Sequence, residues 1–444
     1  MTAENEAVSV STGYIGLVRG NRNFRYLWFG QIVSLLGDWF NLIASAALVA
    51  SLTQSGIAVG GLFVVRMLAQ LVVSPFAGVA ADRYNRKNLL ILTDIGRAIT
   101  LIGFLFVREP GQVWLLYVLT AIQLGLSGFF FPTRTAILPD LVSRKELGAA
   151  NALSSATWSV MLAVGAALGG FAAGQWGVYP SFVIDAFTFV ASAVLIAQIS
   201  YDHKSGLAGS DKRFGAALGQ YVDGIRYLLR HQDNLVIGLN KGAFALTVSG
   251  GFQVIQVALA GRVFVIGEGG GTGLGLMYMS VGIGTGIGPI LARRFTGDRD
   301  RSLRIAIAIS YVTAALGLLI VATLTSFGVV LVGTLVRGIG VGIGWVFSTQ
   351  LLLQLVPDRV RGRVFSTEFA IFTLMNATAA AGMGWALDNT GLTLSRLLQL
   401  MAGLTLLPGT LWVIWNLRRK QPLPHLEHEE TAAPPVPTEG VQEL

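Results

Sequence analysis

The residues of this chain that could do chemistry are a few charged side chains placed inside long apolar segments. Asp38, Arg66 and Asp185 each lie within such a segment. A charge near the middle of a membrane is costly, so it usually faces a partner or a water-filled cavity. An acid whose proton affinity depends on a nearby arginine can take up and release a proton. We therefore treat these three residues as candidates for proton exchange.

The depths of Asp38 and Arg66 predict that the two side chains meet. Asp38 lies about 12 residues, or ~18 Å, into its segment from one side, and Arg66 about 9 residues, or ~14 Å, into the next segment from the other side. In an apolar layer ~30 Å thick these depths are similar. The pair could instead be a static structural salt bridge. Asp185, near the outer end of its segment, is a second protonatable site, a cargo contact, or an acid hydrogen-bonded to its neighbours.

Other charges within the apolar segments have local explanations. Lys241 and Arg337 could attract an anion or balance an acid of the first half, although Lys241 is close enough to the membrane surface to snorkel. Asp94 and Arg97, three residues apart, are expected to form a local pair. Glu368 falls in the first turn of a helix, where the helix dipole favours an acid.

The composition predicts an integral membrane protein. Of the 444 residues, 53% are hydrophobic and only 13% are charged, whereas a soluble protein carries about 25% charge. The chain has no cysteine, and we expect neither a metal site nor a cofactor, because its four histidines lie in the predicted connection and tail. No phosphate-binding loop and no nucleophile–base pair is visible, so an enzyme is not expected.

The apolar segments predict an all-α membrane protein with twelve transmembrane helices in two pseudo-symmetric six-helix halves. The expected helices cover residues 27–50, 57–81, 88–107, 113–131, 150–173, 179–199, 235–260, 270–292, 303–325, 328–354, 364–387 and 394–417. We divide the chain into an N-terminal segment, a first half, a connection with an amphipathic helix, a second half and a disordered tail, which are residues 1–26, 27–199, 200–234, 235–417 and 418–444.

The distribution of basic residues predicts the orientation. Nearly all Lys and Arg between the spans fall in loops of one side, and Arg108, Arg262 and Arg396 are the exceptions. Basic loops stay in the cytoplasm, so we expect a multi-pass protein of the plasma (inner) membrane with both termini, the connection and the tail cytoplasmic. The basic residues behind the net charge of +8 are concentrated in the loops of one side of the membrane and not on one recognition face. The charge therefore does not indicate a nucleic-acid partner.

The turn between the second and third spans carries a resemblance to a known family. Its pattern Gly78-x-x-x-Asp82-Arg83-x-x-Arg86-Lys87 resembles the signature loop of the major facilitator superfamily, and Gly288-x-x-x-Ala292-Arg293 repeats it in the second half. The chain further resembles the macrolide-efflux and enterobactin-exporter-like subgroup, on segments that include Leu36-Gly37-Asp38-Trp39, Leu138-Pro139-Asp140-Leu141-Val142 and Arg361-Gly362-Arg363-Val364.

The signature loop is expected to act as a gate latch formed by Gly78, Asp82, Arg83 and Arg86. Asp82 can accept hydrogen bonds from the free amides at the start of the eleventh helix, around residues 362–365. The bases could pair with Asp140 or with anionic lipid, or could merely obey the positive-inside rule.

A glycine pattern in the fifth span resembles an element of drug:proton antiporters. Gly165, Gly169 and Gly170 match the glycines of Gly-Pro-x-x-Gly-Gly, and Ala166 stands where that element has proline. These glycines would let the helix pack closely against a helix of the other half, or would serve ordinary small-residue packing.

The resemblance implies a secondary active transporter that works by alternating access. The preferred hypothesis is a proton-coupled exporter of a small amphipathic organic molecule, such as a drug, a macrolide or a siderophore-like compound. The alternatives are an uncoupled facilitator or importer, or a non-transporting sensor. The expected partners are this cargo, protons and membrane lipid, and a monomer is expected. Polar and aromatic candidates for the cargo cavity are Trp39, Asn41, Gln70, Gln123, Gln253, Arg337, Trp345 and Asn376.

Overall fold

The first half of the protein is a bundle of six long helices. The computed structural model describes residues 14–201 and 214–418, so the predicted tail and parts of the N-terminal segment and the connection lie outside the described residues. A short helix α1 (Tyr14–Gly20) and the turn η1 (Pro110–Gln112) accompany the six. The long helices are α2 (Arg22–Thr53), α3 (Gly56–Arg83), α4 (Arg86–Phe104), α5 (Val113–Leu141), α6 (Leu147–Trp176) and α7 (Val178–Ala197).

The second half repeats this plan after the surface helix α8 (Phe214–Arg230). Its first span combines α9 (Gln232–Phe244) and α10 (Gly250–Ala258) with two π-helical turns, η2 (Ala245–Ser249) and η3 (Leu259–Val263). The turn η4 (Glu268–Gly270) precedes the other five spans. These are α11 (Gly271–Thr296), α12 (Asp300–Ala322), α13 (Phe327–Leu355), α14 (Asp358–Asn389) and α15 (Leu394–Arg418).

Helix α4 is the exception to the apolar pattern of the spans. Among the described residues, 11 helices are long and apolar enough to cross a membrane, and α4 is not one of them. Its 19 residues include two bases in the first turn together with Asp94 and Arg97. It nevertheless packs against α5 and α7 as the sixth helix of the first half. The expected all-α, twelve-helix architecture is confirmed, with one span made polar by an internal ion pair.

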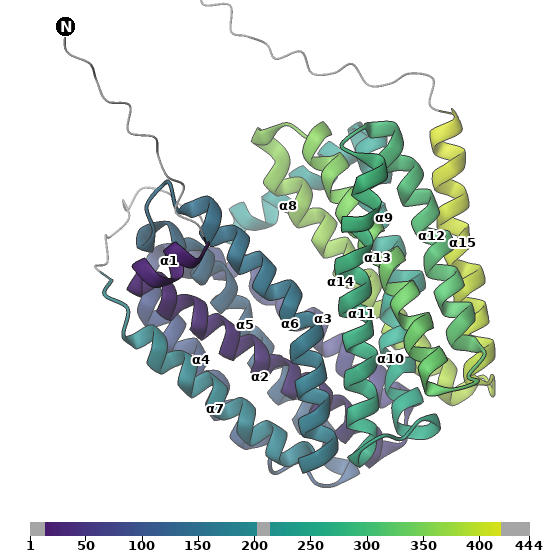
Figure 1. The fold of residues 1–444 in the computed structure, drawn as a ribbon, viewed down its shortest axis with the longest axis horizontal. Coiled ribbons are helices and arrows are strands. Elements are labelled where there is room, and N and C mark those ends of the chain that lie inside the picture. Colours follow the sequence, from purple (N-terminus) through teal and green to yellow (C-terminus); the bar gives the residue numbers. More distant parts are fainter. Residues whose placement is uncertain (1–13, 202–213, 419–444) are drawn as a thin grey trace, which may run out of the picture.

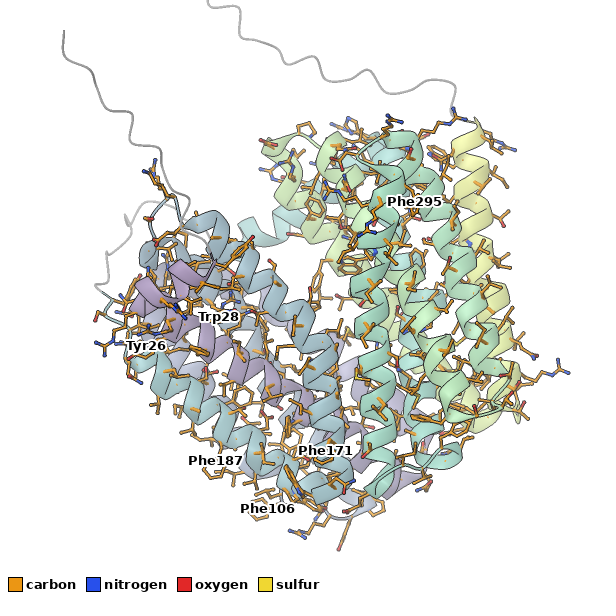
Figure 2. The ribbon with its side chains drawn as sticks, in the orientation of Figure 1. Tyr26, Trp28, Phe106, Phe171, Phe187 and Phe295 are labelled. Atoms are coloured by element: carbon orange, nitrogen blue, oxygen red, sulfur yellow. The ribbon has the colours of Figure 1, made fainter. Side chains whose placement is uncertain are left out.

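The outer surface of the bundle is apolar, as a lipid-facing surface must be. Phe171, Phe187 and Phe295 point away from the helices that carry them, and Phe106 points outward from the turn after α4 (Figure 2). Phe187 is 68% exposed and Phe295 is 89% exposed. Transfer of such side chains into lipid removes apolar area from water, which is favourable. The protein is therefore a multi-pass integral membrane protein.

The two halves meet along two pairs of helices, α6 with α11 and α3 with α14. Gly170 lies so close to Gly275 that a Cβ on Gly170 would be 2.4 Å from the Gly275 Cα atom, and a Cβ on Gly60 would be 2.7 Å from the Ala380 carbonyl oxygen. The halves lie close together at the end away from the described termini, here called the far end (Figure 1). They diverge toward the end where α2 begins and α15 stops, here called the terminal end.

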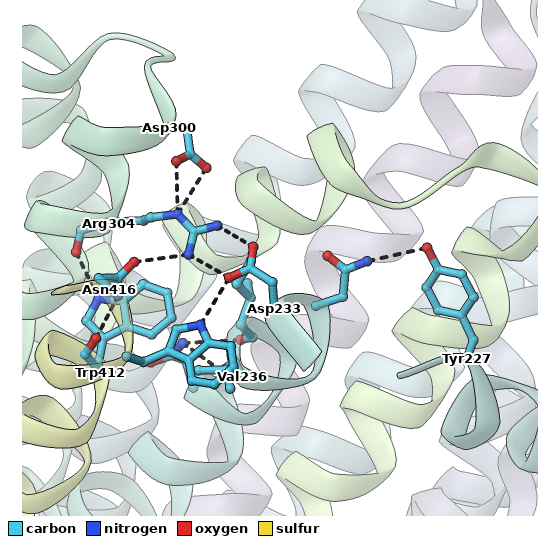
Figure 3. Close-up of polar contacts among 11 residues, drawn as sticks. Tyr227, Asp233, Val236, Asp300, Arg304, Trp412 and Asn416 are labelled. Atoms are coloured by element: carbon cyan, nitrogen blue, oxygen red, sulfur yellow. Dashed lines mark hydrogen bonds and ion pairs between the residues drawn. The ribbon is translucent and has the colours of Figure 1, made fainter. Parts of the chain in front are cut away.

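A polar cluster holds the second half together at its terminal end (Figure 3). The Arg304 guanidinium of α12 donates to Asp300 at 3.0 Å and to Asp233 of α9 at 2.7 Å. It also donates to Asn416 of α15 at 3.1 Å, and the Trp412 indole donates to the Arg304 carbonyl oxygen at 2.9 Å. Because Arg304 is 6% exposed, these partners replace the water that its charge has lost. The cluster fixes α9, α12 and α15 relative to one another.

Candidate transport site

Arg97 of α4 is the centre of the polar site in the first half. Its guanidinium forms ion pairs with Asp38 of α2 and, at 3.4 Å, with Asp94 of α4, and it donates to the Ser34 hydroxyl at 3.1 Å. The guanidinium also lies over the Phe189 ring of α7, 3.8 Å from its centroid. With the Arg97 side chain 1% exposed, these contacts supply the stabilisation that water would otherwise give.

The predicted pair between Asp38 and Arg66 is corrected by this arrangement. Asp38 pairs with Arg97, and the expected local pair of Asp94 and Arg97 is one edge of a larger cluster. Arg66 instead donates to the side-chain amide oxygen (Oδ1) of Asn41 at 3.5 Å. Asp38 and Arg66 do line the same cavity, as expected for two residues at a similar depth in the membrane. The rotation of each helix about its own axis decides the partner, and depth along the helix carries no information on that rotation.

Asp185 of α7 is the third acid of the cluster. It is fully buried, and it accepts hydrogen bonds from the Gln123 amide at 3.4 Å and the Thr188 hydroxyl at 3.3 Å. Its charge interacts with both Asp38 and Arg97. Gly37 permits this contact, because a Cβ there would lie 2.1 Å from an Asp185 carboxylate oxygen. Asp38 and Asp94 thus pair with the Arg97 guanidinium, and Asp185 lies beside this group, held by Gln123 and Thr188.

A cavity of about 180 Å³ opens beside this cluster. The Asp38 side chain is 23% exposed and so reaches the cavity while it contacts the buried Arg97. Three aromatic side chains, one amide and one arginine share the wall with it. The lining includes Asp38, Trp39, Arg66, Gln70, Phe131 and Trp158.

The glycine pattern of α6 makes room for α2 and for the other half. A Cβ on Gly165 would be 2.6 Å from the Trp39 ring, and one on Gly169 would be 2.9 Å from the Trp39 carbonyl oxygen. Of the three predicted packing glycines, Gly170 is the one that faces α11 of the second half. The Trp39 ring in turn reaches Tyr278 of α11, with ring centroids 5.5 Å apart.

Lys241 and Glu368 form a buried ion pair in the second half. The Lys241 ammonium lies 2.8 Å from a Glu368 carboxylate oxygen, and their side chains are 6% and 2% exposed. Lys241 therefore does not snorkel. The prediction that Glu368 lies in the first turn of its helix is wrong, because α14 begins at Asp358, and the carboxylate balances the Lys241 ammonium instead. The ammonium also lies 4.6 Å from the Trp345 ring centroid. These contacts join α9, α13 and α14.

The remaining cavity candidates of the second half have different surroundings. Gln253 of α10 donates to the side-chain amide oxygen (Oδ1) of Asn376 on α14 at 3.1 Å. Arg337 of α13 is 3% exposed, and its guanidinium lies 4.1 Å from the Phe252 ring centroid. Its Nε and Nη1 atoms have no hydrogen-bond partner among the described residues.

The signature loop is anchored within the first half. Arg86 pairs with Asp140 of α5 at 2.8 Å, which was one of the predicted alternatives. Lys87 donates to the Ile199 carbonyl oxygen at 2.8 Å. The Tyr201 hydroxyl donates to Asp140 at 3.1 Å. Burial and the Asp140 carboxylate raise the pKa of Tyr201, so this donor keeps its proton. Arg83 ends α3 and is exposed.

The other two latch residues belong to the last turns of α3. The backbone of Gly78 and Asp82 is helical there, but their surroundings lie outside the described residues.

The far end carries a contact between the halves that the sequence analysis missed. Asp388, near the end of α14, accepts hydrogen bonds from the Ser55 hydroxyl at 2.6 Å and from the Gly56 and Ile57 amides at 2.7 and 2.9 Å. It thereby caps the N-terminus of α3, where a helix dipole favours an anion. Arg262 donates to the Gln54 carbonyl oxygen beside it. The signals in the sequence were Ser55 before a helical run and an acid at the end of the eleventh span.

Two six-helix halves, each with charged residues buried inside it, define a membrane transporter architecture. The model of the Major Facilitator Superfamily matches residues 27–380, and the chain belongs to this superfamily.

Relatives and a solved structure agree with this assignment. The chain is 29% identical to the uncharacterized MFS-type transporter YfiS of Bacillus subtilis (strain 168), over 88% of this chain and 94% of that protein. It is 23% identical to the putative bacilysin exporter BacE of the same organism, over 78% and 83%. It is 22% identical to macrolide efflux protein A of Streptococcus pyogenes, over 79% and 86%. The crystal structure of the nucleoside transporter NupG shares the fold with a TM-score of 0.65 at 14% identity, over 89% and 99%.

Proposed function

We propose that the protein exports a small amphipathic organic molecule in exchange for protons, by alternating access across the plasma (inner) membrane. One observation carries this proposal: Asp38 contacts the buried Arg97 and also reaches an open cavity. A carboxyl group in this position can exchange a proton with water, and its protonation changes the charge that Arg97 meets. The export direction is supported by relatives that are named as exporters or efflux proteins.

The cluster around Arg97 suggests how a proton would act on the helices. When Asp38 is ionised, its attraction to Arg97 holds α2 against α4. When Asp38 is protonated, Arg97 keeps its contacts with Asp94 and with the Phe189 ring, so the guanidinium is not left without partners and the attraction between α2 and α4 weakens. Both protonation states are thus tolerated, which a proton carrier requires.

The alternation of access would use the two helix pairs that join the halves. In the present structure Asp388 caps α3 at the far end. At the opposite end of the same pair, we propose that Asp82, near the end of α3, caps the start of α14 in the other state. We place the termini in the cytoplasm on the distribution of basic loops, so the structure corresponds to a state open to the cytoplasm.

Transport into inside-out proteoliposomes tests the proposal. The probes are ethidium, an amphipathic cation, and 1-pyrenebutyrate, an amphipathic anion, with an acidic lumen to drive exchange. We expect uptake of at least one probe to rise several-fold with the pH gradient. Asp38→Asn should remove this gradient response, because the group that carries the proton is gone.

The matched control is Asp298→Asn, which removes an exposed acid paired with Arg293. This variant should keep the response of the wild type. A response to the gradient in Asp38→Asn equal to that of the wild type would contradict proton coupling through Asp38. Wild-type flux that ignores the gradient would select the uncoupled facilitator, and an absence of flux for both probes would favour the non-transporting sensor.

A further inference from the structure

Two arginines at the centre of the bundle, one from each half, lack an ion pair with a carboxylate among the described residues. Arg337 is 3% exposed, and its guanidinium contacts the Phe252 ring while two of its nitrogens have no hydrogen-bond partner. Arg66 has a long hydrogen bond to Asn41, and the nearby charge of Asp38 already pairs with Arg97. Arg97 and Lys241, by contrast, have carboxylate partners. A buried guanidinium without a counter-charge is costly.

Tyr278 links these two arginines across the interface between the halves. Its side chain belongs to α11, is 7% exposed, and contacts Trp39 of α2. Its hydroxyl has no hydrogen-bond partner among the described residues. Trp39 lines a cavity together with Arg66, and Gly338, next to Arg337, packs against Val281, one turn after Tyr278 on α11. The three side chains therefore lie around one place between the halves.

The polar atoms left without a partner in this region are mainly hydrogen-bond donors. Gln256 lies one helical turn from Phe252 on α10, and Asn41 lies beside Arg66. The unpartnered donors are Nε and Nη1 of Arg337, the Tyr278 hydroxyl, Nδ2 of Asn41 and Nε2 of Gln256. The acids of the first half are turned to Arg97 instead. A site rich in donors and in positive charge suits an acceptor that carries negative charge.

We propose that Arg66, Tyr278 and Arg337 bind an anionic oxygen-bearing group of the cargo, such as a carboxylate. This inference rests on the proposed transport function and narrows its substrate class from amphipathic molecules to amphipathic anions or zwitterions. A guanidinium from each half gives the anion charge-assisted hydrogen bonds on two sides. Such an anion also draws the two halves together, which is the movement that occlusion of a cargo needs.

A matched pair of ligands that differ in charge tests this site. The full chain in lipid nanodiscs is titrated with 1-pyrenebutyrate and with its methyl ester at one pH, and empty nanodiscs give the background. We expect saturable binding of the acid at least tenfold tighter than that of the ester. Arg337→Gln should bring the two affinities together, and Arg337→Lys, which keeps the charge, should restore part of the difference.

Tyr278→Phe serves as the second variant, because it keeps the ring against Trp39 and removes only the hydroxyl. It should reduce the preference for the acid several-fold even if Arg337→Gln fails to fold. Arg293→Gln, an exposed arginine at the terminal end, should leave the preference unchanged.

Equal affinities for acid and ester in the wild type, or an absence of saturable binding of the acid, would overturn the proposal. So would a preference that survives in Tyr278→Phe and in folded Arg337→Gln. The titration uses no pH gradient, so a failure of proton coupling at Asp38 would leave its result intact.

Discussion

At the scale of single residues, the site depends on how closely α2 and α7 approach each other. Gly37 is the point of contact, since a Cβ there would lie 2.0 Å from the Thr188 hydroxyl and 2.1 Å from an Asp185 oxygen. The Thr188 hydroxyl and the Gln123 amide both donate to the Asp185 carboxylate at this contact. The absence of a side chain at Gly37 thus places Asp185 within reach of the charges of Asp38 and Arg97.

Gly37→Ala should therefore destabilise the protein and disturb the acid cluster together. Overpacking of this kind costs about 1–3 kcal/mol, which is measured as a lower midpoint of thermal unfolding in detergent. The same substitution at Gly382 of α14, where a Cβ meets nothing within 4 Å, should leave the midpoint unchanged or raise it slightly, because alanine favours a helix. Equal effects at the two positions would show that α2 and α7 are less closely packed than described.

At the scale of helices, some features follow from the sequence and others do not. The spans could be predicted because a membrane-spanning helix needs a long apolar run. The distribution of basic residues between the loops predicts the orientation of these spans. The partners of buried charges could not, because Lys241 and Glu368 are 127 residues apart and meet only through the packing of α9 on α14. Arg97 was missed as a centre for the same reason: nothing in its own helix indicates that it faces α2 and α7.

The ion pair of Lys241 and Glu368 should stabilise the packing of α9 against α14. Glu368→Met leaves a buried ammonium without a counter-charge, and we expect a loss of about 3–5 kcal/mol in the free energy of unfolding. Replacing both residues with methionine should recover most of this loss, since it removes both charges and keeps apolar volume. The measurement is a double-mutant cycle of chemical unfolding. Additive effects of the two single variants would show that the residues do not act as a pair.

At the scale of the whole molecule, the antiparallel pair of α3 and α14 has an acid near the C-terminal end of each helix. Asp388 of α14 caps the start of α3 in the present structure. Asp82 is the second-last residue of α3, as Asp388 is of α14. If each acid caps its partner helix in one state only, the two states of the transporter differ in which cap is formed. The equilibrium between them then depends on the difference between two similar free energies.

This symmetry predicts opposite effects for two conservative substitutions. Asp388→Asn weakens charged hydrogen bonds made only when the far end is closed, so it should favour the state open at the far end. Asp82→Asn should favour the state open at the terminal end. Hydrogen bonds to charged groups contribute about 1.5–3 kcal/mol each, so shifts of about tenfold or more are expected. The double variant should return close to the wild-type equilibrium, because the sites are far apart and their effects add.

Distances between spin labels at the far end measure these populations. The chain has no cysteine, so cysteines introduced at Glu109 in the first half and Leu392 in the second can be labelled selectively; both positions are exposed. We expect the longer distance to gain population in Asp388→Asn and to lose it in Asp82→Asn, while Asp298→Asn matches the unsubstituted pair. If Asp388→Asn and Asp82→Asn both shift the population of the longer distance in the same direction, the two acids do not stabilise opposite states. Alternating access would then have to depend on the contacts of α6 with α11, where the glycines set the distance and no acid caps a helix among the described residues.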